Sequence, residues 1–341
     1  MPQLQIKKGE EVNIMKPGYK KNSQVMEKYS IFIVLFAMII ACSFLNKNFL
    51  SVNNVTNIMK QLAVGTILAY GEMLLIVSGM LDLSSGAVLA LAGVFSVNCY
   101  KTTGSLLLAF VLAVIIAVVC NIVNALMVTN FNTPPFIATL AMQMVARGIA
   151  LFYTQGQNIN QLDNSVVFGQ GNIGPVPISI LFMIVITGII WYIMRHTRFG
   201  RSLYAIGGNE EAAVASGINV RRNKYIVFII NGILVGIAGV LFMSRVNAGL
   251  PNGAVGYEME GLTAAIVGGT SFSGGVGTTF GTLAGAFIIG CLNNIMNLVG
   301  VDSYIQQIVK GCIIAVAVIW DIRSKNKKST KIILVEEKHK E

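Results

Sequence analysis

Residues 195–224 read RHTRFGRSLYAIGGNEEAAVASGINVRRNK and carry six of the 25 Lys and Arg residues of the chain. The two ends carry most of the others, with six basic residues in 1–28 and seven in 323–340. Basic residues in short loops mark the cytoplasmic side of a membrane protein, because their translocation is disfavoured. The pattern therefore predicts that both ends and this central loop face the cytoplasm. An even number of membrane spans must then separate successive clusters.

Between these clusters the chain is apolar: 54% of its 341 residues are hydrophobic, 12% are charged, and the mean hydropathy is +0.69. Soluble domains contain about 25% charged residues, so the composition indicates an all-α polytopic membrane protein. The net charge of +10 is confined to segments that flank apolar runs, which favours contact with anionic lipid headgroups over nucleic-acid binding. Ten runs are candidate transmembrane helices: 29–45, 62–79, 84–100, 105–128, 136–154, 178–194, 225–246, 258–270, 279–299 and 304–320.

Six of these candidate spans precede the central loop and four follow it, so both numbers are even, as the charges require. We therefore expect a cytoplasmic segment at 1–28, a transmembrane domain at 29–322 with a cytoplasmic loop at 195–224, and a basic cytoplasmic tail at 323–341. A GxxxG pattern in the seventh span (Gly232 and Gly236) predicts close packing against a neighbouring helix, because small residues let two backbones approach.

Two Gly- and Ser-rich stretches interrupt the apolar pattern at membrane depth. SGMLDLSSG (78–86) lies between the second and third spans, and GGTSFSGGVG (268–277) follows the short eighth span. Irregular backbone survives inside a membrane only where it is buried in protein or lines a wet cavity, and broken helices form the substrate path of many transporters. By parity both breaks face the same side. Polar stretches at 155–177 and 247–257 are expected to be external loops.

Polar side chains inside the expected spans are candidates for that path. Glu72 lies near the middle of the second span, where a charged carboxylate costs about 3 kcal/mol. It either faces the path or an ion-pair partner, or hydrogen-bonds a neighbouring helix as a protonated acid. Arg147 either reaches the outer headgroups, faces the path, or pairs with an acid such as Glu72. Amides on several helices favour a polar, uncharged solute over an ion. The candidate path residues are Glu72, Asp82, Ser84, Gly86, Asn124, Arg147, Gly268, Gly269, Ser271, Ser273, Gly274, Gly275, Asn293 and Lys310.

The central loop contains a second candidate site, NEEAAVASG (209–217). Asn209 suits the N-cap of a short helix, acidic residues occupy its first turn, and Gly217 suits its end. Such a helix on the cytoplasmic face suits docking to another protein; the alternative is a plain solvated loop. GxxxxGK[ST], HExxH and GxSxG are absent from the sequence, and its five cysteines are scattered. We therefore expect no ATP hydrolysis, no other enzymatic activity and no metal site in this chain.

GRSLYAIGGNEEAAVASGI, followed by VGGTSFSGGVGTTFGTLAGAF, resembles the permease subunits of bacterial monosaccharide ABC importers of the ribose and galactose type. VSGMLDLSSGAVLALAG, TPPFIATLAMQMVARGIAL and NLVGVDSYIQQIVKG agree with this resemblance, which covers roughly residues 30–322. Where the family commonly reads GGIDLS, this chain reads GMLDLS, with Met80 and Leu81.

The resemblance implies a multi-pass permease of the bacterial cytoplasmic membrane that moves a monosaccharide inward by alternating access. It would pair with a second copy or a paralogue. Its other partners would be a cytoplasmic ATPase that binds ATP-Mg, as two subunits or one fused chain, and an extracytoplasmic sugar-binding protein. This chain itself would hold no cofactor. The residues implied to contact the ATPase are Gly207, Asn209, Glu210, Glu211, Ala212, Ala213, Ser216 and Gly217.

Two other functions stay open at the level of the sequence. A related permease could carry nucleosides, branched-chain amino acids or a sugar-like signal, with Glu72 and Arg147 serving a zwitterion. An ion-coupled secondary carrier could use Glu72 as its coupling site. Competition by amino acids and not by sugars would favour the first. Uptake that survives ATP depletion but collapses with an uncoupler would favour the second.

Overall fold

Helices form almost all of the molecule in the computed structural model, which describes residues 18–160 and 162–340; residues 1–17 of the expected cytoplasmic segment lie outside this part. The helices are α1 (Gly18–Leu45), α2 (Val52–Val77), α3 (Ser85–Thr103), α4 (Leu106–Asn130), α5 (Pro135–Thr154), α6 (Val167–Gln170), α7 (Ile178–His196), α8 (Arg198–Gly208), α9 (Glu210–Ala215), α10 (Val220–Val246), α11 (Tyr257–Val267), α12 (Thr279–Val299) and α13 (Ser303–Lys340). The described residues also form a 3-10 helix at Asp163–Val166 and four short strands: β1 (Ile159–Asn160), β2 (Asn172–Ile173), β3 (Val176–Pro177) and β4 (Ala248–Gly249).

Local sequence explains where the long helices begin and end. The hydroxyls of Ser51 and Ser105 accept hydrogen bonds from the backbone N–H groups at the starts of α2 and α4, which would otherwise lack partners. α5 begins at Pro135, whose missing N–H is not needed in a first turn. α3 and α12 end at Gly104 and Gly300, with φ of 69° and 77°, in the left-handed region that glycine reaches without strain.

Within the described residues, seven helical segments are long and apolar enough to cross a membrane: α2, α4, α5, α7, α10, α12 and Ser303–Arg323 of α13. α1 adds a shorter apolar stretch, Ile31–Leu45. The other two expected spans coincide with α3 and with α11, which has only 11 residues. The prediction of an all-helical polytopic membrane protein is confirmed, and each of the ten expected spans falls on one helix. That all ten cross the membrane stays a prediction.

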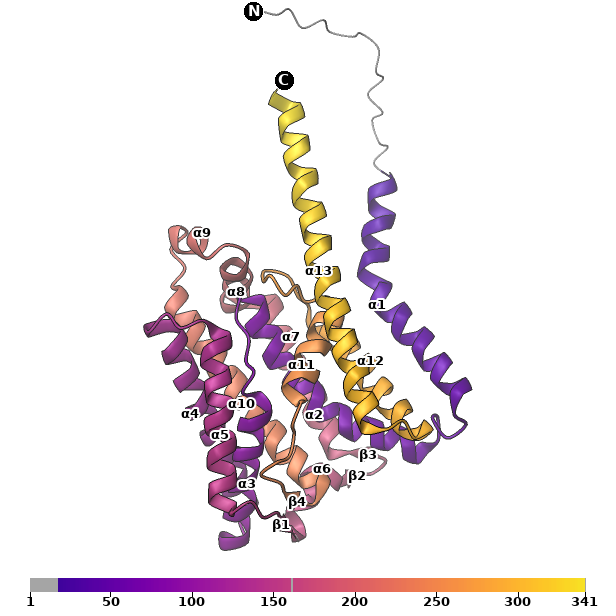
Figure 1. Ribbon diagram of the computed structural model, residues 1–341, viewed down its shortest axis with the longest axis vertical. Coiled ribbons are helices and arrows are strands. Elements are labelled where there is room, and N and C mark those ends of the chain that lie inside the picture. The colour runs from indigo at the N-terminus through magenta and orange to yellow at the C-terminus, as the bar shows by residue number, and fades with distance from the viewer. Residues whose placement is uncertain (1–17, 161, 341) are drawn as a thin grey trace, which may run out of the picture.

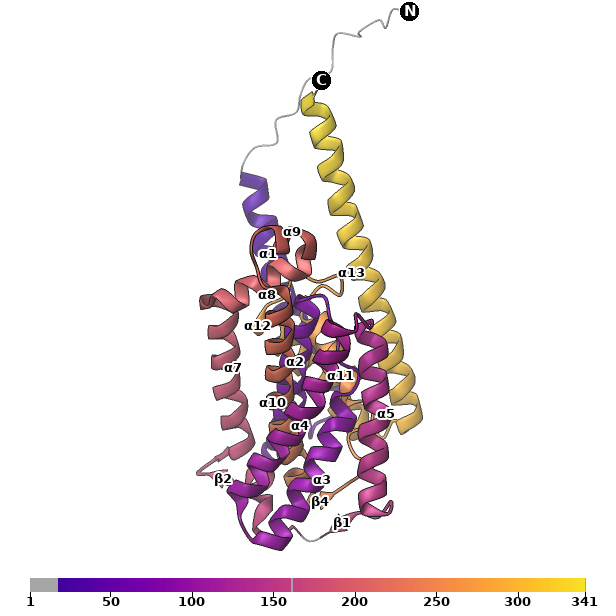
Figure 2. The same ribbon diagram turned by 90° about the vertical axis from the view of Figure 1, so that its left-hand side faces the viewer.

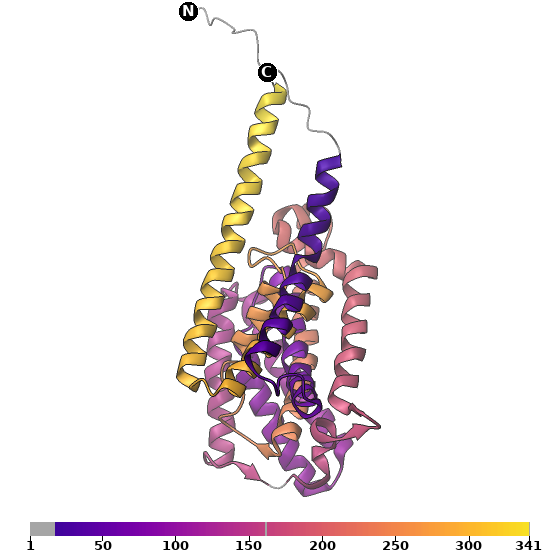
Figure 3. The ribbon, with the colours of Figure 1, turned by 90° about the vertical axis from the view of Figure 1, so that its right-hand side faces the viewer.

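The core lies around α2 and α10. The apolar windows of these two helices are 83% and 72% buried, whereas those of α4, α5 and α7 are only 22%, 28% and 33% buried. α10 packs against α4 through its two GxxxG glycines: a Cβ on Gly232 would lie 2.7 Å from the Val118 Cα, and one on Gly236 would lie 2.6 Å from the Val114 Cα. The predicted close packing is therefore confirmed. α7 and α13 flank opposite edges of the bundle (Figures 2 and 3).

The two ends of the bundle differ in what they carry. α8 and α9 lie at the end where α1 begins and α13 finishes, and the four strands lie at the opposite end (Figure 1). β1 pairs antiparallel with β4, with Ile159 opposite Gly249. This pairing joins the stretches 155–177 and 247–257, which are expected to be external, at one end of the molecule. β2 pairs with β3 within the first of these stretches.

The two breaks also meet, at the end that carries α8. Residues 78–84 separate α2 from α3, and residues 268–278 separate α11 from α12. Gly275 N donates a 2.9 Å hydrogen bond to Val77 O, which joins the second break directly to the end of α2. The hydroxyl of Tyr204, on α8, donates to Gly277 O at 2.8 Å. The predicted location of both breaks on one side is therefore confirmed.

Candidate functional site

The short helix expected in the central loop is present as α9. The Asn209 side chain accepts a 2.9 Å hydrogen bond from Ala212 N, and Gly217, with a φ of 81°, ends the helix. Ala213 is buried against Ile206 and Val220. The other side of the helix is exposed, and it includes the apolar Val214, which is 58% exposed.

The face that α9 presents to solvent combines charge with this apolar side chain. Glu210 forms an ion pair with Lys224 at 2.8 Å, which ties α9 to the start of α10. Glu211, Ala212, Ser216 and Gly217 are exposed. These contacts hold α9 against the bundle and leave an acidic and apolar face exposed. That this face docks to a partner protein stays a prediction.

The end of α8 touches both breaks at Gly207. A Cβ on Gly207 would lie 1.8 Å from Val77 O and 2.7 Å from Gly275 N, so only glycine fits there. A Cβ on Gly274 would likewise lie 2.6 Å from Gly207 O. Burial raises the pKa of Tyr204, more than Arg195 lowers it, so the phenol stays protonated and keeps donating to the second break. A movement of α8 would therefore shift the backbone next to both breaks.

A buried polar network surrounds the first break. Asp82 accepts hydrogen bonds from the backbone and hydroxyl of Ser84 and a 2.7 Å bond from Asn231 Nδ2. Glu72 accepts a 2.6 Å bond from the Ser85 hydroxyl and a 3.3 Å bond from Asp82 N. Buried carboxylates need such donors, and the start of a helix also favours negative charge. The network includes Glu72, Asp82, Ser84, Ser85, Asn121, Asn124 and Asn231, all of them buried.

Glu72 is thus enclosed by protein, with 0% of its surface exposed, and it is not among the residues that line the cavities described below. The network joins α2, the start of α3, α4 and α10, through Glu72, Ser84, Asn124 and Asn231. Because its members are buried and paired with one another, their contacts fix the position of the break. Whether any of them meets a solute in another conformation stays a prediction.

The starts of α3 and α11 lie against each other. Glu258, in the first turn of α11, accepts bonds from Gly256 N at 3.2 Å and from Gln143 Nε2 at 3.3 Å. A Cβ on Gly86 would lie 2.1 Å from Glu258 Oε2, so glycine permits this approach. Arg147 donates to Pro251 O at 2.6 Å and to Gly253 O at 2.8 Å, and so holds the loop that leads into α11.

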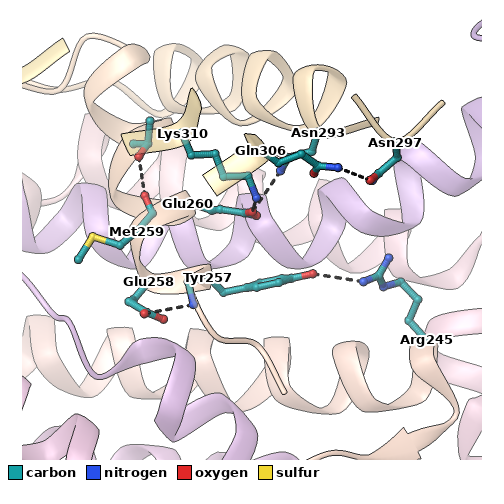
Figure 4. Close-up of polar contacts among 11 residues, drawn as sticks. Arg245, Tyr257, Glu258, Met259, Glu260, Asn293, Asn297, Gln306 and Lys310 are labelled. Carbon is teal, nitrogen blue, oxygen red and sulfur yellow. Dashed lines mark hydrogen bonds and ion pairs between the residues drawn. The ribbon is translucent and has the colours of Figure 1, made fainter. Parts of the chain in front are cut away.

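A second polar group lies between α11, α12 and α13 (Figure 4). Lys310 Nζ lies 2.5 Å from Glu260 Oε1, and Asn293 Nδ2 donates to the same oxygen at 3.2 Å. Gln306 lies one helical turn before Lys310 on α13, and its Nε2 donates to Asn297 Oδ1 at 2.9 Å. Glu260, Gln306 and Lys310 line a cavity of about 400 Å³, a size typical of small-molecule sites, which span about 300–1,000 Å³.

A larger apolar groove of about 700 Å³ continues along α13 toward the α8 end, with Ile313 lining both hollows. At its far end Asp321 accepts hydrogen bonds from the Ser271 hydroxyl at 3.1 Å and from Phe272 N at 2.9 Å. α13 therefore contacts the bundle at the ion pair and at the second break. The 18-residue apolar window of α13 is otherwise unburied, and Trp320 on this helix is 77% exposed.

The structure distributes the predicted path residues over distinct places. Glu72, Asp82, Ser84 and Asn124 join the buried network, Gly86 and Arg147 lie around the start of α11, and Asn293 and Lys310 belong to the polar group at α13. Gly268, Gly269, Ser271, Ser273, Gly274 and Gly275 form the second break, with Gly269 on the wall of the apolar groove.

Sequence reasoning missed three functional candidates: Glu260, Asn231 and Asp321. The signal for Glu260 was available, because an acid inside an expected span requires a partner and Lys310 required one too. Asn231 lies in an apolar run with no local pattern to single it out. Among the residues that the structure describes, no group of three or more His, Cys, Asp and Glu could hold a metal ion.

Known proteins resemble this chain over most of its length. The family model described as branched-chain amino acid transport system / permease component matches residues 54–318. The chain is 40% identical to the ribose import permease protein RbsC of Bacillus subtilis (strain 168) over 300 residues, which is 87% of this chain and 93% of that protein. In Escherichia coli (strain K12) it is 34% identical to the D-allose transport system permease protein AlsC over 299 residues, which is 86% of this chain and 91% of that protein. It is 32% identical to the L-arabinose transport system permease protein AraH over 308 residues, which is 90% of this chain and 94% of that protein. No solved structure matches the chain.

Proposed function

This chain belongs to the permease family of ABC importers described as branched-chain amino acid transport system / permease component, and from that premise we propose that it carries a monosaccharide of the ribose class into the cell. The observation that carries the solute class is the match, over 86–90% of this chain, to relatives named for ribose, allose and arabinose. The relative named for ribose is 40% identical and those named for allose and arabinose are 34% and 32% identical, so ribose is the first sugar to test.

As the permease component of an ABC importer, this chain is a multi-pass membrane protein and is not itself the ATPase. Such permeases work with an ATPase and a binding protein. In our proposal the ATPase docks on the exposed face of α9, around Glu211 and Val214, and ATP-Mg is bound by that partner alone. The sugar-loaded binding protein docks at the opposite end, near 155–177 and 247–257, where β1 and β4 join the two stretches.

Motion at α9 would reach the membrane through Gly207. The Gly207 backbone contacts the ends of both breaks, so a shift of α8 would displace 78–84 and 268–278 together. The solute would follow the polar cavity and the apolar groove along α13. The exposed side of α13 would face a second copy of the permease or a paralogue across that path. The full count of ten spans, with breaks at membrane depth, is part of the same proposal.

Two observations disfavour an amino acid as the solute, in spite of the description of the family. Glu72 is fully buried and bonded to Ser85 and Asp82, and Arg147 donates to two loop carbonyls. Both groups therefore make structural contacts where a zwitterion would need them available. The same burial disfavours Glu72 as the coupling site of an ion-driven carrier.

Uptake into proteoliposomes tests the proposed function. The permease would be reconstituted with the ATPase and the binding protein with which it co-purifies, and uptake of radiolabelled ribose would be measured with ATP inside. We expect ATP-dependent uptake that excess unlabelled ribose abolishes and excess leucine leaves unchanged. Competition by leucine, with no competition by ribose, allose, arabinose or galactose, would refute the sugar assignment and favour the amino acid alternative.

A further inference from the structure

The cavity between α11, α12 and α13 has a mostly apolar lining that carries several polar groups and no net charge. Of the residues that line it, Glu260 and Lys310 are the charged ones, and they lie 2.5 Å apart. Ser303, Gln306 and Gln307 add neutral hydrogen-bonding groups to the same surface. The described part of the chain contains two ion pairs. Glu210–Lys224 lies in the central loop, and Glu260–Lys310 joins α11 to α13, at the edge of the bundle.

We propose that the Glu260–Lys310 pair makes the path selective for uncharged polyhydroxyl solutes, because each charge cancels the other while both remain strong hydrogen-bonding groups. This inference rests on the proposed function. A lone charge at this depth would attract ions of the opposite sign and would oppose the passage of a neutral solute, since an uncompensated charge keeps its own water. The paired charges avoid both effects. Charge-assisted hydrogen bonds to hydroxyls are also stronger than neutral ones.

The geometry holds the carboxylate in place and leaves it accessible. Lys310 Nζ and Asn293 Nδ2 both donate to Oε1 of Glu260, and the structure records no hydrogen bond to Oε2 within the described residues. Asn293 is buried on α12 and does not line the cavity, so it holds the Glu260 carboxylate from the side away from the cavity. The Glu260 and Lys310 side chains are 18% and 31% exposed. A solute in the cavity can therefore meet Oε2 of Glu260 and the ammonium of Lys310.

The cavity adjoins a second hollow, the apolar groove along α13. Ile313 lines both the 400 Å³ cavity and the 700 Å³ groove that continues toward the second break. The groove is apolar apart from Asp321, which is bonded to Ser271 and Phe272 N. The Glu260–Lys310 pair is therefore the charged feature that a solute meets between the external end of α11 and the second break.

Charge variants of the reconstituted importer test the inference. The variants are Glu260→Gln and Lys310→Met, which each leave one charge alone, and the double variant Glu260→Gln/Lys310→Met, which is neutral again. The reversed pair, Glu260→Lys/Lys310→Glu, covers the case in which a single variant fails to assemble. Lys47→Met is the matched control, because Lys47 is exposed in the turn between α1 and α2 and lies outside both the cavity and the proposed docking sites.

Each importer would be assayed for ribose uptake and for ATP hydrolysis stimulated by loaded binding protein. We expect each single variant to lose about tenfold or more in uptake, with stimulated hydrolysis within about twofold of the original complex. The neutral double variant and the reversed pair should transport within about threefold of the original, as should Lys47→Met.

The outcomes separate this inference from the proposed function. If the unaltered complex shows no ATP-driven sugar uptake, the proposed function fails, and the inference fails with it. If the unaltered complex transports but the single variants transport equally well, the pair does not face the path, and lipid rather than solute occupies the cavity. If the neutral double variant and the reversed pair transport no better than the singles, charge cancellation is not the property that matters. Either of the last two results would overturn the inference alone.

Discussion

Replacing Gly207 with alanine should separate ATP hydrolysis from transport, because this residue is where α8 touches both breaks. The added Cβ would lie 1.8 Å from Val77 O, whereas ordinary contact begins at 3.4 Å. The backbone of α8 must therefore move away from the end of α2 by about 1.6 Å, the difference of these two values. Overpacking of this kind costs about 1–3 kcal/mol.

The displacement also reaches the second break. Gly275 N lies 2.7 Å from the same Cβ position and donates to Val77 O at 2.9 Å, so the hydrogen bond that joins the second break to the end of α2 is strained together with the contact. We expect sugar uptake to fall about tenfold, which corresponds to about 1.4 kcal/mol of lost coupling. The ATPase should still bind, because the exposed face of α9 is unchanged.

Gly208→Ala is the matched control, because a Cβ on Gly208 has no atom within 4 Å. Both changes raise helix propensity equally, by about 1 kcal/mol, so any difference between them reports the contact. The assay is the number of sugar molecules moved per ATP hydrolysed in proteoliposomes. A Gly207→Ala importer that transports as efficiently as Gly208→Ala would refute the idea that α8 acts on the breaks at this point.

Three further substitutions probe other parts of the account. Glu211→Lys reverses a charge on the exposed face of α9, so the ATPase should no longer co-purify while membrane insertion is normal; normal uptake would remove the docking assignment. Asn231→Leu removes the donor shared by Asp82 and Asn121 and should lower the free energy of unfolding by about 1–3 kcal/mol, seen as a lower melting temperature in detergent; an unchanged melting temperature would contradict the structural role of the network. Asp321→Ala removes the two hydrogen bonds between α13 and the second break, so a spin label near the end of α13 should become more mobile; an unchanged spectrum would show that the groove is held by apolar contacts instead.

Local sequence signals predicted most of the helices, including the short helix of the central loop. Hydropathy and charge gave ten apolar runs, each of which coincides with one helix, and Asn209 and Gly217 bound α9 as their capping chemistry suggests. The two Gly- and Ser-rich stretches do interrupt the helices. These features depend on a few neighbouring residues, so a single sequence contains the information.

Side-chain partners were less accessible to sequence reasoning. Glu260 and Lys310 are separated by 50 residues, and Asp82 and Asn231 by 149. Their contacts depend on how helices pack, and no spacing rule within one helix reveals them. Glu72 shows the same limit: the sequence left a path residue and a hydrogen-bonded acid as alternatives, and only the packing shows that the carboxylate is enclosed.

The central claim is tested most directly by identifying the proteins that co-purify with the chain and the energy source that drives uptake. The chain would be isolated from its native membrane in a mild detergent, and the proteins that accompany it would be identified. Our account predicts a P-loop ATPase in the complex whose hydrolysis is stimulated by ribose-loaded binding protein, and sugar uptake that stops when ATP is depleted. A chain that purifies without an ATPase, and uptake that survives ATP depletion but collapses with an uncoupler, would contradict the account and establish an ion-coupled carrier.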